Sequence, residues 1–458
     1  MFRKMMIFFL FLLPSFAFAQ IEPLQQLDMQ IPHGSLTLSH AIRMALDSSP
    51  SVKQAAIRIE AAQAVVGQAR SALKPMVSAN IGRRHQNSTI QPDWAPQVRF
   101  NDSFDIWTAG VEANWLLFDG FARRARILAA EYSVEASEKT RDETRRLLAE
   151  AVSGAFYQAQ LAVESMLIAQ QNRNFNRALE EEADIRWQTG SIPEAEKLNF
   201  AVRALQAESD YLRAEQSFKL VTVVLAELMA LPDAKLPTNL YPVRSEADVL
   251  KQAVPDYDKE FTYALQQRPD LQALNASVAA LQQNKKVQQG SYWPKLILNS
   301  GFDYNKYEGL KSGDQEEHDA YAGLHLSWDL YQGGSRAAKV REAEHEISAL
   351  RQQKRQQILA IQSSIQQAIA SAEATRSMYQ RQQQSLLLTA KIREHIEKAY
   401  RAGVANLTRL NEAQTDLVRA AGAESASRIN YLLSLQQLKA ASGRILNDEG
   451  GESGQSVQ

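Results

Sequence analysis

Residue types that carry out chemistry are present in this sequence, but they are not spaced for it. The seven histidines form no HExxH pair or other ligand spacing, and Gly333-Gly334 lacks the Gly-Lys that follows in a phosphate-binding loop. The run Glu180 to Asp184 carries enough charge to bind a cation, although such a run is more often a solvated helix face. Without cysteine there is no disulfide and no thiolate metal site. We therefore expect no catalytic residue, no metal and no cofactor.

The composition excludes one more class of function. Of the 458 residues, 22% are charged and 45% are hydrophobic, and the formal net charge is −1. Nucleic-acid-binding proteins need a basic excess to offset the phosphate charge. We therefore expect no nucleic-acid partner.

The first 19 residues have the three regions of a secretory signal peptide. Arg3-Lys4 precedes an apolar run, and Ala17-Phe18-Ala19 offers a small-residue cleavage site before Gln20. After residue 19 no apolar segment approaches the roughly 20 residues of a membrane-spanning helix. The mature chain is therefore expected to be exported, either as a soluble protein or as one that crosses a membrane with β-strands.

The rest of the chain consists of two copies of one repeat unit. Pro75 and Gly82 in the first half match Pro294 and Gly301 in the second, and Gly120 and Gly190 match Gly333 and Gly403. Each unit reads as helix, strand, strand, very long helix, glycine-centred turn and helix. The expected domains are a signal peptide (1–19), a first repeat (20–231), an inter-repeat equatorial segment that packs as a collar (232–258), a second repeat (259–446) and a disordered tail (447–458). The expected elements are 37–73, 76–86, 104–119, 120–187 and 192–231 in the first repeat, and 259–291, 295–307, 319–332, 335–400 and 406–445 in the second.

Four segments alternate apolar and polar residues with the period of a strand. Trp107, Val111 and Trp115 share one face of the second segment, while Glu112 and Asn114 share the other. Such strands fit either a membrane barrel, with lipid outside and water inside, or a soluble sheet with one solvated face. In the barrel reading, the residues that face the lumen include Glu112, Asn114, Asp303 and Asp329.

Four strands cannot close a barrel, and open sheet edges are not tolerated in hydrocarbon. Two chains would give eight strands and a filled interior, whereas three would give twelve strands and a water-filled lumen. We therefore expect a homotrimer. The long helices carry apolar residues at steps of three and four and are too polar for lipid, so they are expected to stand in the periplasm. From the helices alone, an exported coiled-coil scaffold is an alternative.

In plan and in local motifs, nearly the whole mature chain resembles the TolC-type outer-membrane efflux proteins. The motifs are the Ala-Leu…Pro segments at Ala45 and Ala264, the helix-to-strand prolines Pro75 and Pro294, and a glycine before each last helix. Trp-Leu-Leu-Phe-Asp-Gly and Trp-Asp-Leu-Tyr-Gln-Gly-Gly also stand at the two strand-to-helix junctions. The resemblance implies a mostly α-helical α+β membrane protein, in which a trimeric 12-strand barrel in the outer membrane of a Gram-negative bacterium continues as a periplasmic helical barrel.

The resemblance also implies partners and contact residues. The two turns would form the inner mouth and dock a periplasmic adaptor, which links the channel to an inner-membrane ABC or proton-driven pump. The barrel itself would contact outer-membrane lipid. The adaptor-docking tips would be Thr189, Gly190, Ser191, Ile192, Ala402, Gly403, Val404 and Ala405.

The sequence departs from the family at the expected gate. Well-studied members carry paired aspartates beyond the second tip glycine, where this chain has Arg409 and Glu412; the equivalent positions of the first repeat are Glu196 and Asn199. An Arg–Glu contact between neighbouring helices would keep the mouth shut, whereas a solvated Arg409 would not.

The cargo is the least determined part of the prediction. A chain without a lipidated cysteine favours type I protein secretion, with multidrug or small-molecule efflux as the alternative. The pump would supply the energy, because nothing in the chain binds a nucleotide.

Overall fold

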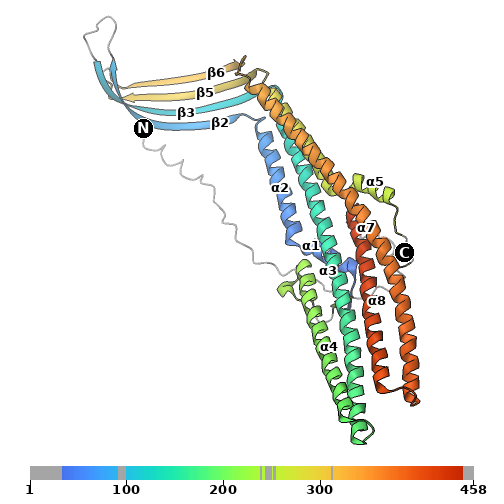
Figure 1. Cartoon of the computed structure of the whole chain (residues 1–458). Helices are drawn as coiled ribbons and strands as arrows, with labels where there is room; N and C mark the ends of the chain where they lie inside the picture. The colour runs from blue at the N-terminus through green and yellow to red at the C-terminus, as the bar shows by residue number, and fades with distance from the viewer. Residues whose placement is uncertain are drawn as a thin grey trace, which may run out of the picture.

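The computed structural model describes residues 34–90, 100–237, 240–242, 250, 254–310 and 313–446. The predicted signal peptide (1–19) and tail (447–458) lie outside the described residues. A curved sheet forms one end of the molecule, and a long helical bundle leads away from it to two hairpin tips (Figure 1).

The described elements occur in the same order in both halves of the chain. The first half contains α1 (Leu38–Ser48), α2 (Pro50–Ser71), β2 (Met76–Ile90), β3 (Phe100–Phe118), α3 (Ala122–Gln188) and α4 (Glu194–Leu228). The second contains α5 (Tyr257–Gln267), α6 (Pro269–Gly290), β5 (Lys295–Glu308), β6 (Gln315–Ser327), α7 (Ser335–Arg401) and α8 (Leu407–Ser442). Both α3 and α7 have 67 residues. The order confirms the predicted internal repeat.

The prediction of one continuous first helix in each repeat was wrong, because a proline divides each of them into two helices. Ser49 separates α1 from α2, and Arg268 separates α5 from α6. Both residues have extended backbone, with ψ of 126° at Ser49 and 124° at Arg268. The next residues, Pro50 and Pro269, start the following helices. A proline disfavours the helical conformation of the residue before it, yet it fits the first turn of a new helix.

The strands also differ from the expected bounds. The hairpin of β2 and β3 extends to Ile90 and Phe100, beyond the predicted loop boundaries at 87 and 104. At the other end of the sheet, β6 stops at Ser327, which pairs with Lys295 of β5. The residue before Lys295 is Pro294, which has no N–H to donate, so the ladder ends there.

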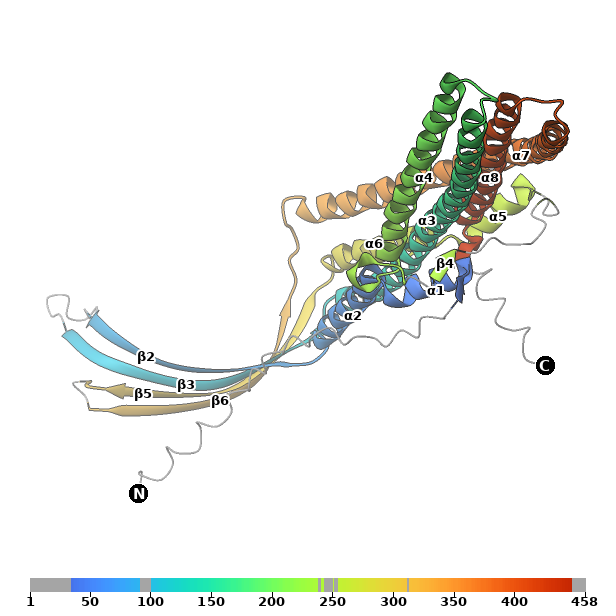
Figure 2. The same ribbon diagram turned by 90° about the horizontal axis from the view of Figure 1, so that it is seen from below.

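The strands form one antiparallel sheet in the order β2-β3-β5-β6. The helices nearest the sheet form a layer in the order α2, α3, α6, α7, and those nearest the tips follow the order α4, α3, α8, α7. Figure 2 shows the strands leading into the helices nearest the sheet, with α4 and α8 farther from it. At every level, an element of the first repeat lies at one edge and an element of the second repeat at the other. Within the described residues, none of these edge elements has a neighbour on its outer side.

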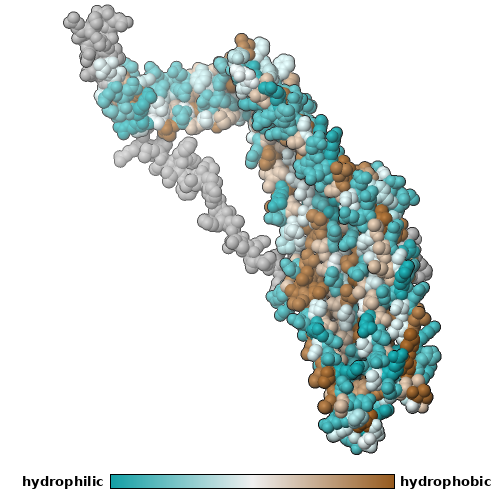
Figure 3. All heavy atoms as spheres, in the orientation of Figure 1, coloured by the Kyte–Doolittle hydropathy of each residue, from teal (hydrophilic) through white to brown (hydrophobic). Residues whose placement is uncertain are grey.

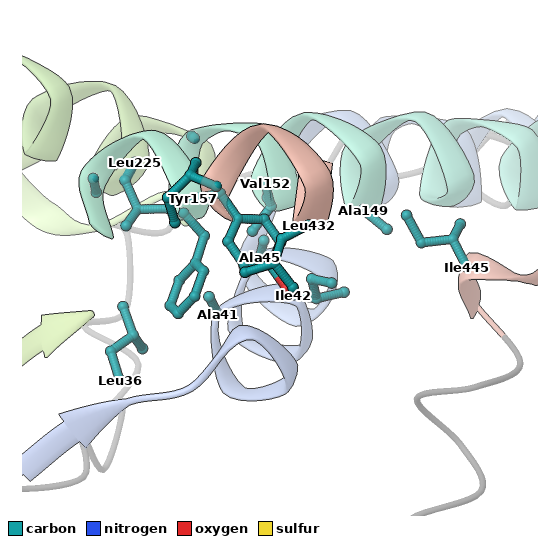
Figure 4. Packing of buried hydrophobic residues seen from close by; sticks show 14 of the residues in the cluster. Leu36, Ala41, Ile42, Ala45, Ala149, Val152, Tyr157, Leu225, Leu432 and Ile445 are labelled. Carbon is teal, nitrogen blue, oxygen red and sulfur yellow. The ribbon is translucent and has the colours of Figure 1, made fainter. Parts of the chain in front are cut away.

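The main core lies midway along the helical part (Figure 4). Leu36, Ala41 and Ile42 bring β1 (Gly34–Leu36) and α1 against Val152 of α3 and Leu432 of α8. Small residues such as alanine let helix backbones approach closely in this region. In the equatorial segment, β4 (Leu240–Pro242) pairs with β1, and Leu236, Leu250 and Val254 pack against the same core. The described part of this segment therefore lies against the helices.

Two buried arginines hold the C-terminal end of α8. Arg146 donates to the carbonyl oxygen of Ala440 at 2.9 Å, and Arg268 donates to that of Ala441 at 2.6 Å. Cations are favoured at helix C-termini, where the last carbonyls have no partner within the helix. Asp270 accepts from Arg268 at 2.7 Å and from Gln357 at 2.8 Å. These contacts join α8 to α3, α6 and α7.

We expect a pH-dependent contribution to stability from this cluster. Burial raises the pKa of Asp270, but hydrogen bonds and the charge of Arg268 outweigh it, so the pKa lies below its ordinary value. A carboxyl with a lowered folded-state pKa stabilises above its unfolded pKa, and that contribution is lost as the pH falls through the lower folded value. Asp270→Asn should therefore cost about 2 kcal/mol at pH 7 and progressively less below about pH 4. Thermal unfolding of the trimer in detergent across this range measures it, and a pH-independent difference would contradict it.

Two exposed apolar seams mark the lateral edges of the helical part. One lies on α4 and consists of Leu198, Val202, Leu205, Leu212 and Leu220. The other lies on α7 and consists of Leu359, Met378, Leu387 and Leu388. Apolar patches are visible along the helical part in Figure 3. No described helix combines the length and low polarity needed to cross a bilayer. Exposed apolar residues on edge helices are typical of subunit contacts.

Replacing Leu205 by aspartate should therefore prevent trimer assembly, because it places a charge in an apolar seam where Leu205 is now 69% exposed. Size-exclusion chromatography with light scattering in detergent measures the oligomer. Leu167→Asp is the matched control, since this exposed leucine lies on α3, which has neighbours on both sides. An intact Leu205→Asp trimer would contradict the assignment of the seam.

Candidate functional site

The two faces of the sheet differ in chemistry, as the alternation predicted. Trp107, Val111 and Trp115 lie on one face and are 40%, 50% and 40% exposed. Glu112 and Asn114 lie on the other, where Asn114 Nδ2 donates to Glu112 Oε1 at 2.7 Å and Asn299 donates to Asn114. One face can therefore meet lipid while the other carries a hydrogen-bonded polar surface.

Asp303 shares this polar face, but the fourth predicted lumen residue does not belong to a strand. Asp303 pairs with Gly110 in the sheet, and a side chain at Gly110 would collide with its carboxylate. Asp329 lies two residues past the end of β6, where it is exposed and accepts from Gln332 Nε2 at 2.8 Å. The prediction that Asp329 lies on a strand was therefore wrong, because the ladder ends when Pro294 interrupts the partner strand.

The strand-to-helix junction is held by Arg123. Its guanidinium donates to the carbonyl oxygens of Ala72 at 3.1 Å and Leu117 at 3.0 Å, and it lies 3.4 Å from the carboxylate of Asp119. The chain turns into α3 through Gly120, which has φ of +65° and contacts the backbone of Gly290 too closely for a side chain. The sequence indicated the turn, but not that one buried arginine ties α2, β3 and α3 together.

The first tip connects α3 to α4. Gly190 has φ of +72°, the N–H of Ser191 donates to the carbonyl of Arg186 at 2.7 Å, and Thr189 Oγ1 donates to the same carbonyl at 3.0 Å. These bonds satisfy carbonyls that the end of a helix leaves without partners. Thr189, Gly190 and Ser191 are exposed, whereas Ile192 is half-buried against the other hairpin.

The second tip connects α7 to α8 in a similar way. Gly403 has φ of +76°, and the N–H of Val404 donates to the carbonyl of Ala399 at 2.9 Å. Asn406 then caps α8 by accepting the N–H of Arg409 at 2.8 Å. Ala402, Gly403 and Val404 are exposed, and Ala405 is half-buried. Val404 is 83% exposed, which is unusual for an apolar side chain of this size.

The two hairpins are joined just above their tips. Leu179, Ala183 and Phe200 of the first hairpin pack with Leu407 and Leu410 of the second. A polar contact lies beside this cluster and consists of Glu182, Arg186 and Tyr400. The Tyr400 hydroxyl donates to Glu182 and accepts from Arg186 at 2.5 Å, and Arg186 pairs with Glu182 at 2.7 Å. We refer to these three residues as the latch, which the sequence alone did not indicate.

Burial and the hydrogen bond to the Glu182 carboxylate both raise the pKa of Tyr400. The raised pKa keeps the phenol protonated at physiological pH. The hydroxyl therefore remains a hydrogen-bond donor between the hairpins.

The four predicted gate residues are distributed over both hairpins. Arg409 Nη1 lies 3.1 Å from Glu412 Oε2, but the two are three positions apart on α8 and their side chains are 64% and 53% exposed. Within the described chain, Arg409 and Glu412 therefore pair along one helix, and a contact between neighbouring helices of the trimer stays a prediction. Arg409 also lines a groove of about 470 Å³ between α7 and α8. In the first hairpin, Glu196 is half-buried in the first turn of α4, and Asn199 is exposed.

Comparison with known proteins assigns the fold. Residues 41–230 and 262–444 match the outer membrane efflux protein family, one segment in each repeat. The chain belongs to this family. It is 27% identical over 390 residues to the protein CyaE of Bordetella pertussis, covering 84% of this chain and 79% of the relative. The pyoverdine export outer membrane protein OpmQ of Pseudomonas putida is 27% identical over 418 residues, with 89% and 85% covered.

The solved structures with the same architecture include the Campylobacter jejuni CmeC outer membrane channel. The TM-score is 0.73 at 15% identity, over 90% of this chain and 89% of that one. As a member of the outer membrane efflux protein family, the chain is one third of a trimeric outer-membrane channel, in which a barrel continues into a large periplasmic helical part. Channels of this family transport substrates rather than catalyse reactions, and they work with a periplasmic adaptor and an inner-membrane pump.

We expect the latch to restrain the hairpins. Tyr400→Phe removes the hydroxyl that joins Glu182 and Arg186, and a hydrogen bond to a charged group contributes about 1.5–3 kcal/mol. The hairpins should then separate more often, which single-channel recording in planar bilayers would detect as a higher open probability. The control is Tyr211→Phe, which also removes a tyrosine hydroxyl. It keeps the aromatic ring, whose centre lies 4.1 Å from the guanidinium carbon of Arg173. Equal open probability in both variants and the wild type would rule out a latch.

Proposed function

We propose that this channel is the exit duct of a type I protein secretion system. Its cargo would pass from an inner-membrane pump and a periplasmic adaptor through the helical tunnel and the barrel. The observation that carries the duct is the continuous path of elements from the hairpin tips to the sheet, with a polar face on the sheet (Figure 1). The absence of cysteine supports the choice of protein secretion, because it leaves no residue for the N-terminal lipid of the lipoprotein subgroup that is often paired with drug pumps.

Small-molecule export is the second candidate function. It is favoured by the similarity to OpmQ, whose name identifies it as a pyoverdine export protein. Both candidates use the same duct and differ in the pump that the adaptor brings to it. Identification of the captured pump therefore distinguishes them.

The tips are the proposed adaptor contact. Thr189, Gly190 and Ser191 project from one hairpin, and Ala402, Gly403 and Val404 from the other. Their backbone N–H groups are used within the turns, so the surface they offer consists of the Thr189 and Ser191 hydroxyls and of small and apolar groups. Ile192 and Ala405 are half-buried, and we assign them to support of the turns.

We propose that Arg409 and Glu412 act at the mouth by exchanging partners. An exposed intrahelical pair contributes only about 0.3–0.5 kcal/mol, so it can open at little cost. Across the mouth of a closed trimer, Arg409 would then contact an acid of a neighbouring helix. Glu196 and Asn199 would contribute from the equivalent positions on α4.

A cysteine-free chain makes the adaptor contact directly testable. Val404→Cys introduces a unique thiol, and we expect a thiol-to-amine cross-linker to join it in cells to a periplasmic adaptor, with the pump recovered in the same complex. Mass spectrometry then identifies the pump. Gln315→Cys at the start of β6, at the far end of the molecule, is the control and should capture no adaptor. Capture from Gln315→Cys but not from Val404→Cys would contradict the proposed orientation.

A further inference from the structure

A cavity of about 930 Å³ lies where the sheet meets the helices. Asn114, Leu116 and Ile297 contribute to its wall, and the register of β3 and β5 places them on the same face as Glu112 and Asp303. The cavity therefore opens on the polar face of the sheet. We call it the neck cavity.

Three cationic side chains line the neck cavity from three segments of the chain. Lys74 comes from the turn between α2 and β2, Arg126 from the second turn of α3, and Lys295 from the start of β5. All three are exposed, and none forms an ion pair within the described part of the chain. Asp119 also lines the cavity, but Arg123 occupies its carboxylate through its backbone N–H at 2.9 Å and its guanidinium at 3.4 Å. The cavity is therefore positively charged.

The internal repeat supplies a further cation at the same level. Lys339 occupies in α7 the position that Arg126 occupies in α3, and it is also exposed. In a trimer, three arginines and three lysines would therefore alternate around the neck. A ring of like charges in a confined aqueous space focuses the field toward its centre.

The lumen face beyond the neck has the opposite charge. The sheet register places Glu112, Asp303, Asp319 and Glu317 on that face, with Arg84 as the cation toward its far end. Cationic and acidic zones thus follow each other along the path. The cationic zone is local to the junction, since the whole chain has a formal net charge of −1.

We propose that the neck cavity binds anionic groups of the cargo, carboxylates and phosphates, through Lys74, Arg126 and Lys295. This inference rests on the proposed duct function. An anionic group would be held at the neck, because the acidic face of the barrel beyond it repels the group, and the pump would supply the drive for onward movement. Because the three cations are solvated, the attraction is electrostatic and falls with ionic strength.

Tripolyphosphate is the probe for this site. Isothermal titration of the purified trimer in detergent should show saturable binding that weakens with salt, and the triple variant K74Q/R126Q/K295Q should bind at least tenfold more weakly. The control is R124Q/K286Q, which removes two cations from a separate pocket at the same junction, beside Trp293 and Phe121. Equal affinity in the wild type and the triple variant, or equal loss in both variants, would overturn the proposal.

Two further measurements distinguish an anion site in the lumen from a lipid contact. If added lipopolysaccharide displaces tripolyphosphate from the wild type, the cations form a lipid contact and the proposal fails. In planar bilayers, the reversal potential in a salt gradient should shift toward cation selectivity in the triple variant and stay unchanged in the control. If the protein binds tripolyphosphate but shows no conductance, the proposed duct function is wrong and the anion site is retained. A chain that conducts with unchanged selectivity refutes the site alone.

Discussion

The unpaired edges of the four-stranded sheet are the constraint on which the rest of the structure depends. A backbone N–H or C=O without a partner costs several kcal/mol in hydrocarbon, so β2 and β6 can exist in a membrane only when other chains pair with them. The same incompleteness continues along the helices, where α2 or α4 lies at one edge and α7 at the other. Closure of the sheet therefore also closes the helical layers. One rotation that relates the subunits pairs the open edges of both the sheet and the helices.

Much of this architecture could be predicted from the sequence, because its main signals are periodic. The alternation around Trp107 and Trp115 identified the strand faces, and glycines at 190 and 403 identified turns that require a positive φ. The breaks at Pro50 and Pro269 were missed because a long helical pattern continues across them. A proline can start a helix as readily as end one, so its presence alone does not show whether a helical pattern is broken there.

The parts of the site that sequence reasoning missed are single side chains that join distant segments. Arg123 and Tyr400 occupy unremarkable positions in their own helices, and their partners lie 51 and 218 positions away. No periodic pattern records such contacts. Asp329 shows the reverse case, since its alternation continues past Ser327 although the partner strand has ended. The alternation of apolar and polar residues predicts which face a side chain lies on only where the strand is still hydrogen-bonded to its partner.

The apolar seams on α4 and α7 also determine how the protein forms. A lone chain exposes Leu205 and Leu388 to water at 69% and 63%, and it leaves both sheet edges open. Much of the stabilising burial then arises only on association, so at equilibrium the concentration of folded trimer rises with the cube of the free-chain concentration. The channel is therefore most vulnerable to aggregation and proteolysis before assembly. Its abundance would be set by the rate at which three chains meet.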